Sequence, residues 1–167
     1  HERALVLMDS LHGNEPSLDV VEKLSLSYVV GAGALKLAST VLEEQPESQW
    51  TPAPEFDKRR KTRDAAVCVA SIQCEGWETK RTLVGRRWRR EGDMFPHHLA
   101  VLTNLTPEHP QLAALMERRK LSFAEAVLWL YERKGKCETY FKGMLSDLGL
   151  HHPPCQNWDA NAAFYAI

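Results

Sequence analysis

The sequence of 167 residues has no long hydrophobic run. Its longest stretch free of Asp, Glu, His, Lys and Arg is the 12 residues between Lys23 and Lys36. A transmembrane helix needs about 20 apolar residues, so we expect no helix that crosses a membrane. Four cysteines are too few for a disulfide framework in a chain of this length. We therefore expect reduced thiols and a cytoplasmic protein.

Other absences narrow the class further. The sequence has no internal repeat and no low-complexity segment, and Gly31-Ala32-Gly33 lacks the rest of a nucleotide-binding glycine motif. A hydrophobic fraction of 44% and a charged fraction of 26% are typical of globular domains and exclude a disordered, collagen-like or coiled-coil chain. No signal-peptide pattern follows His1, and the last residues are apolar. We expect a piece of a longer protein.

Charged residues are abundant, but positive and negative charges are unevenly distributed along the sequence. Residues 1–57 carry three bases against ten acids, a net charge of −7; residues 58–90 carry eleven bases against three acids, +8; residues 91–167 carry seven against nine, −2. Bases this dense repel one another unless an anion is near, and a nucleic-acid backbone is the commonest such partner. The alternative is a solvated strand face whose arginines pair with the acidic first third.

Two clusters make up this basic segment. The candidate DNA-binding residues are Lys58, Arg59, Arg60, Lys61 and Arg63 in the first cluster, and Arg86, Arg87, Trp88, Arg89 and Arg90 in the second. Trp77 and Trp88 are candidates either for stacking on bases or for packing within the protein.

Hydrophobic periodicity predicts an α/β fold. Short apolar runs at 4–8 and 28–32 flank a segment with helical spacing, which is typical of a parallel βαβ unit. Strands are expected at 65–72, 79–84 and 99–103, and helices from about 107 to 120 and from 123 to 148. The expected organisation is a core part at 1–42, a linker at 43–64, a mainly antiparallel β insertion at 65–105, and C-terminal helices at 106–167.

Two carboxylates are candidates for a metal site. Asp9 follows a buried strand, and the carboxyl ends of such strands are where open α/β sheets place ligand groups. Glu138 lies on the apolar stripe of the last long helix, where a carboxylate must be paired, protonated or bound to metal. Lys134, one turn earlier, can instead pair with it. Hard oxygen ligands suit Mg²⁺ or Mn²⁺.

These residues resemble the C-terminal part of the catalytic domain of bacterial insertion-sequence transposases of the DDE type, which have an RNase H-like fold. Asp9-Ser10 after a strand is similar to the region of that family's second catalytic aspartate. The signature around its catalytic glutamate resembles Tyr131, Lys134-Gly135, Glu138, Lys142, Asp147-Leu148-Gly149-Leu150 and Ala160-Asn161-Ala162-Ala163-Phe164. The strand before the last helices is similar to 101–105.

The resemblance implies DNA transposition. In that family three carboxylates hold two Mg²⁺ ions about 3.5–4 Å apart, one activating the attacking oxygen and the other stabilising the leaving oxygen. Asp9 and Glu138 would be two of the three carboxylates, and the first aspartate would lie upstream. Tyr131, Lys134 and Lys142 would contact phosphates, although Lys134 replaces an arginine, and Leu145 stands where the family has a lysine. The implied partners are double-stranded DNA with terminal inverted repeats and a second copy of the enzyme.

Three other interpretations remain open. The chain can be an RNase H-like nuclease that does not join DNA ends, or a non-enzymatic DNA-binding remnant of a decayed transposable element. A zinc site is the third, because His97-His98, His151-His152, Cys155, Cys68 and Cys74 supply ligand types. Their spacing matches no zinc finger or knuckle.

Overall fold

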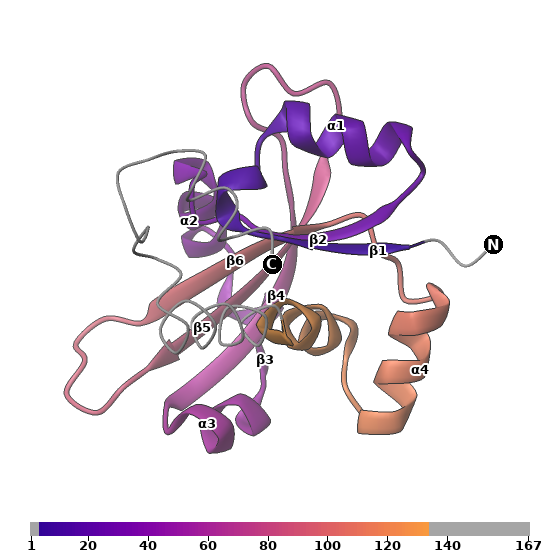
Figure 1. Cartoon of the computed structure of the whole chain (residues 1–167). Helices are drawn as coiled ribbons and strands as arrows, with labels where there is room; N and C mark the ends of the chain where they lie inside the picture. The colour runs from indigo at the N-terminus through magenta and orange to yellow at the C-terminus, as the bar shows by residue number, and fades with distance from the viewer. Residues whose placement is uncertain (1–3, 134–167) are drawn as a thin grey trace, which may run out of the picture. The chain divides into compact units, whose positions relative to one another are not determined.

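The computed structural model describes residues 4–133, which contain a mixed six-stranded sheet with helices on both faces (Figure 1). The strand order is β1-β2-β6-β5-β4-β3. The strands are β1 (Leu5–Met8), β2 (Ser27–Gly31), β3 (Thr51–Pro52), β4 (Arg63–Ile72), β5 (Arg81–Arg89) and β6 (His97–Thr103). β1 and β2 are parallel, and every other neighbouring pair is antiparallel. The predicted α/β class is confirmed.

Side chains cap the start of two of the described α-helices. They are α1 (Glu15–Lys23), α2 (Lys36–Glu43), α3 (Pro54–Arg60), α4 (Pro110–Arg119), the short 3₁₀ helices η1 (Ser10–His12) and η2 (Glu47–Gln49), and a helix over 123–133. The Asn14 side chain accepts from the backbone N–H of Ser17 and caps α1. Glu125 accepts from the Ser122 backbone N–H at 2.9 Å, so Ser122 and Glu125 form a capping box where the sequence predicts a helix from 123.

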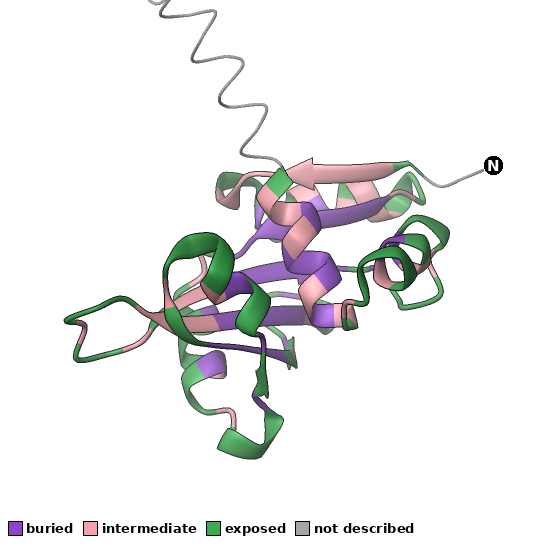
Figure 2. Ribbon diagram, turned by 90° about the horizontal axis from the view of Figure 1, so that it is seen from below, coloured by how far each residue is buried: buried purple, intermediate pink, exposed green. Residues whose placement is uncertain are grey.

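Two hydrophobic cores lie on opposite faces of the sheet. Because successive strand residues point to opposite faces, Val29 and Val84 join one core, while Tyr28 and Leu83 join the other. Residues of α3, α4 and the helix 123–133 cover the first core, and residues of α1 and α2 cover the second. Figure 2 shows the buried residues concentrated in the central strands.

Polar side chains at the end of β6 join the antiparallel strands to the parallel pair. The Asn104 side chain accepts from the Tyr28 backbone N–H at 2.9 Å and donates to the Leu26 carbonyl at 3.0 Å. The Thr103 hydroxyl donates to the Tyr28 carbonyl at 2.7 Å. The β insertion expected at 65–105 is therefore continuous with the sheet that contains β1 and β2.

The segment expected to be a linker, 43–64, is different in the structure. It contains η2, β3 and α3, and β3 pairs with β4. The next predicted helix begins at Pro110 rather than at about 107. Over residues 4–133 we find no helix of the length and apolar character that a membrane span requires.

Candidate active site and nucleic-acid interface

Asp9 lies directly after β1, at the edge of the sheet where both parallel strands end. Its Oδ1 accepts from the backbone N–H of Ser10 at 2.5 Å and from the Ser10 hydroxyl at 3.0 Å, and Asp9 is the N-cap of η1. These bonds fix the orientation of a half-buried carboxylate. The position is the one that the sequence predicted for a ligand group.

Tyr131 reaches the same edge of the sheet from the helix 123–133. A Cβ built on Gly31, the last residue of β2, would lie 2.5 Å from the Tyr131 hydroxyl oxygen and 3.2 Å from Ser10 Cβ. Only a glycine leaves room for this approach. Two segments that the sequence singled out separately, Asp9-Ser10 and Tyr131, are therefore neighbours in the fold.

The remaining predicted residues of this site, Glu138, Lys134 and Lys142, lie outside the described residues. Between residues 4 and 133, no group of three or more His, Cys, Asp or Glu side chains is arranged to bind a metal ion. The carboxylate of Asp9 is a hard oxygen donor, as Mg²⁺ requires. His151, His152 and Cys155, considered for zinc, are also outside the described part of the chain.

The first basic cluster is exposed at the end of α3. Lys58, Arg59 and Arg60 form its last turn, Lys61 follows with a positive φ of 54°, and Arg63 begins β4. Lys58 pairs with Glu55 at 2.7 Å, but both side chains are well exposed, so this pair contributes little to stability. The five positions are accessible in the way that phosphate contacts require.

A further basic run, which the sequence analysis did not single out, lies close to this cluster. Arg118, Arg119 and Lys120 end α4. The Arg119 guanidinium lies 4.5 Å from the centroid of a Trp129 ring, and Trp129 lines a small cavity together with Arg59. The run of three bases in the sequence was the available signal, but the net charge of −2 over residues 91–167 concealed it.

Arg86 lies inside the protein. Its guanidinium is 4.8 Å from the Phe56 ring and 4.5 Å from the Trp88 ring, and the residue is 6% exposed. The predicted phosphate contact needs an exposed guanidinium, so the position of Arg86 does not suit it. Trp88 packs between Arg86 and His97, whose ring stacks on it at 5.6 Å. Trp77, the other base-stacking candidate, is 8% exposed and packs beneath Arg81.

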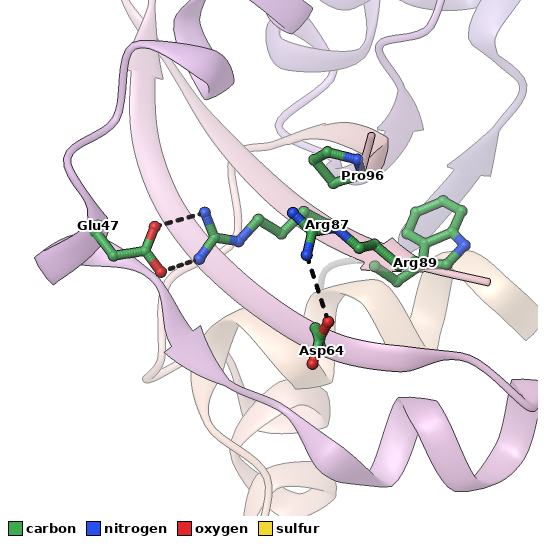
Figure 3. Close-up of a pocket in the computed structure, with 6 residues that line it drawn as sticks. Glu47, Asp64, Arg87, Arg89 and Pro96 are labelled. Carbon is green, nitrogen blue, oxygen red and sulfur yellow. Dashed lines mark hydrogen bonds and ion pairs between the residues drawn. The ribbon is translucent and has the colours of Figure 1, made fainter. Parts of the chain in front are cut away.

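Arg87 and Arg89 line a pocket of about 410 Å³ together with Glu47, Asp64, Trp88 and Pro96 (Figure 3). Arg87 forms a bidentate pair with Glu47, with one bond of 2.8 Å, and this bond lowers the pKa of the Glu47 carboxyl. Arg89 lies 3.7 Å from Asp64. Each of the two arginines is thus paired with an exposed carboxylate, an anionic group that a phosphate can replace.

The strand pairing concentrates positive charge beside this pocket. Arg63 of β4 is directly opposite Arg89 of β5, and a bulge follows in β4. Like charges directly opposite one another are unfavourable unless an anion lies near them. Arg90 is exposed at the end of the strand. Lys61, Arg63, Arg87, Arg89 and Arg90 supply the charge that an anionic polymer needs.

Comparison of the sequence with models of known protein families and with curated proteins finds no match.

Proposed function

We propose that this chain is part of an enzyme of DNA transposition that cleaves phosphodiester bonds at transposon ends and joins them to target DNA in a metal-dependent reaction. The observation that carries the proposal is the meeting of Tyr131 with the Asp9-Ser10 segment at the carboxyl ends of the parallel strands. Asp9 and Glu138 are the proposed catalytic carboxylates.

The local geometry supports a ligand role for Asp9. Its carboxylate is oriented by two bonds from Ser10 and lies at the sheet edge where α/β proteins bind ligands. The sequence spacing predicts that Glu138 follows Tyr131 by two turns on the same helical stripe. Asp9 and Glu138 would then hold Mg²⁺ or Mn²⁺, which stabilises the charge that develops on phosphoryl oxygens.

The topology supports the finer fold assignment that we propose, an RNase H-like core with a β insertion. β1, α1 and β2 form a parallel unit, and the helix 123–133 returns to the end of β2 after the antiparallel strands. β1 is the terminal strand of the described sheet. An upstream strand that ends in the first catalytic aspartate would pair with its outer edge.

The proposed substrate is double-stranded DNA. The exposed bases of α3 and β4 and those at the end of β5 would contact the backbone, with release of counterions. Tyr131, Lys134 and Lys142 would contact the phosphate beside the cleaved bond. Two copies acting on paired transposon ends, as the resemblance implies, would complete the assembly.

The test uses the full-length enzyme with Asp9→Asn and Glu138→Gln as separate variants. Each is expected to lose strand cleavage and strand transfer while it retains salt-sensitive DNA binding, because neither removes a cation. Glu44→Gln, at the exposed C-cap of α2, is a control for the loss of one carboxylate charge. Cleavage of transposon ends by either site variant would contradict the assignment.

The same assays separate the other interpretations. An enzyme that cleaves DNA but never joins ends is a nuclease of the same fold. A protein that binds DNA equally well at every Mg²⁺ concentration and does not cleave it is a binding remnant.

A further inference from the structure

The hairpin between β5 and β6 forms an arm that extends beyond the two cores. Figures 1 and 2 both show it reaching away from the helices. The last three residues of β5 and the first three of β6 are only partly buried or exposed. Most of the remaining residues of both strands are buried. Trp88 pairs with His97 across the arm, and their rings stack. The arm is therefore a two-stranded ribbon whose strands are held together by backbone pairing and by the stacked rings of Trp88 and His97.

The turn at the tip of the arm has a defined conformation. Asp93 Oδ2 accepts from the Arg90 backbone N–H at 2.6 Å and lies 2.9 Å from His97 Nε2. These bonds lower the pKa of the Asp93 carboxyl. Gly92 has a φ of +85°, which other residues rarely adopt. The turn thus holds the next two residues in fixed positions.

Those two residues are the apolar side chains Met94 and Phe95, which are 81% and 75% exposed. Adjacent large apolar groups that a fixed turn holds in water are unfavourable unless a partner covers them. Their neighbours in the arm carry both charges: Glu91 and Asp93 belong to the turn, and the arginines lie at its base. Arg90 is exposed, and the Arg89 side chain is 43% exposed.

An apolar tip with arginines at the base of the arm matches the chemistry of DNA bending. Proteins that bend DNA insert apolar side chains such as Phe and Met between base pairs from the minor groove, while Arg and Lys contact the flanking phosphates. The arginines at the base of the arm, where Arg63 lies directly opposite Arg89, favour a polyanionic partner over the apolar surface of another protein. Pro96, next to Phe95, further restricts the backbone.

We propose that the β5–β6 arm bends DNA by inserting Phe95 and Met94 between base pairs at a flexible step. This inference rests on the proposed function, because it requires that the chain bind DNA. Arg89 and Arg90 hold the phosphates on either side of the inserted side chains. The arm is distinct from the sheet edge at Asp9, so the two proposals are tested by different residues.

The test measures base unstacking in duplexes of about 30 base pairs, a length that permits bending. One duplex carries 2-aminopurine at a central TA step, which is easily unstacked, and the other has a stiff A-tract in its place. The full chain is expected to raise 2-aminopurine fluorescence and to bind the TA duplex about tenfold more tightly than the A-tract duplex.

Variants locate the effect. Met94→Ala combined with Phe95→Ala should abolish both the fluorescence change and the preference, while affinity for the A-tract duplex stays unchanged. Phe95→Leu should retain most of both, because the side chain stays large and apolar. Leu24→Ala, at the C-cap of α1 where the side chain is 65% exposed, is the control and should behave as wild type. Arg89→Gln should reduce the salt slope of binding by about 1.

The outcomes distinguish the two proposals. If the wild-type chain binds neither duplex, DNA binding fails and the arm proposal fails with it. If it binds both duplexes but the double alanine variant unstacks the TA step as wild type does, the arm proposal alone is overturned. Loss of self-association in the double variant, measured by sedimentation and without any change in DNA binding, would make the arm a protein interface and also overturn it.

Discussion

The two ends of β5 carry arginines on the same face of the strand but in opposite environments. Arg81, at the start, is 4% exposed in its side chain and meets three carboxylates of α1: Asp19 at 2.7 Å, Glu22 at 3.1 Å and Glu15 at 3.9 Å. Arg87, near the end, is 24% exposed in its side chain and meets the single, exposed carboxylate of Glu47. One strand therefore has a buried cation, Arg81, that carboxylates of the protein hold, and a partly exposed cation, Arg87, that an anionic ligand can reach.

Hydrogen bonding deepens this contrast. Arg81 donates to Glu22 and Asp19, and Glu22 also accepts from the Tyr28 hydroxyl at 2.9 Å. One nitrogen of Arg81, Nη1, is buried without a hydrogen bond and has only the longer ion pair to Glu15. A nearly saturated buried network has no room for a phosphate. The Arg87–Glu47 pair stands at the surface, where water or an anion can replace the carboxylate.

The largest expected effect comes from removing the buried cation. Arg81→Met should lower the free energy of unfolding by roughly 3 kcal/mol, because it leaves the three carboxylates of α1 without their cation. Arg87→Met should lower it by less than about 1 kcal/mol, as expected for a surface pair. Urea unfolding of both variants measures the difference. Equal losses would show that the two ends of β5 do not differ as described.

Alkaline pH sharpens the same comparison. Burial, followed by the nearby Glu22 carboxylate, raises the pKa of Tyr28 well above its usual value of 10.0. The folded state thus keeps the proton that the unfolded state loses, so the stabilisation is complete below pH 10 and is lost as the pH rises above 10. Stability should fall there by about 1.4 kcal/mol per pH unit from this one group.

Tyr28→Phe should remove that part of the slope, and Arg87→Met should retain it. Unfolding free energies measured between pH 9 and pH 11 provide the test. If wild type and Tyr28→Phe show the same slope, Tyr28 is not the group that keeps its proton.

Much of the parallel unit could be predicted from the sequence because its signals are local. The apolar runs at 4–8 and 28–32 and the helical spacing between them each depend on residues a few positions apart. The prolines and acids of 43–64 indicate a linker, whereas the structure has η2, β3 and α3 in that segment. In the fold, Pro52 lies in an edge strand and Pro54 starts α3, two positions where proline is well tolerated.

The candidate site could be predicted only in part. Asp9 follows a strand, and that signal is local. The meeting of Gly31 with Tyr131 depends on how the helix 123–133 packs across the sheet, which no local pattern contains. The arginines of β5 show the same limit, since the sequence gives identical side chains while Phe56, Glu22 and Glu47 determine whether each is buried or accessible.

The smallest expected effect tests whether Glu47 competes with DNA for Arg87. Glu47→Gln should tighten binding to a duplex of mixed sequence by about two- to fivefold at low salt, because it weakens a surface pair that DNA must replace. In an Arg87→Gln background the same change should have little effect. Glu44→Gln, at the C-cap of α2, removes an equal charge nearby and serves as the control. If Glu44→Gln tightens binding as much, the gain reflects net charge alone, and Glu47 does not compete with DNA for Arg87.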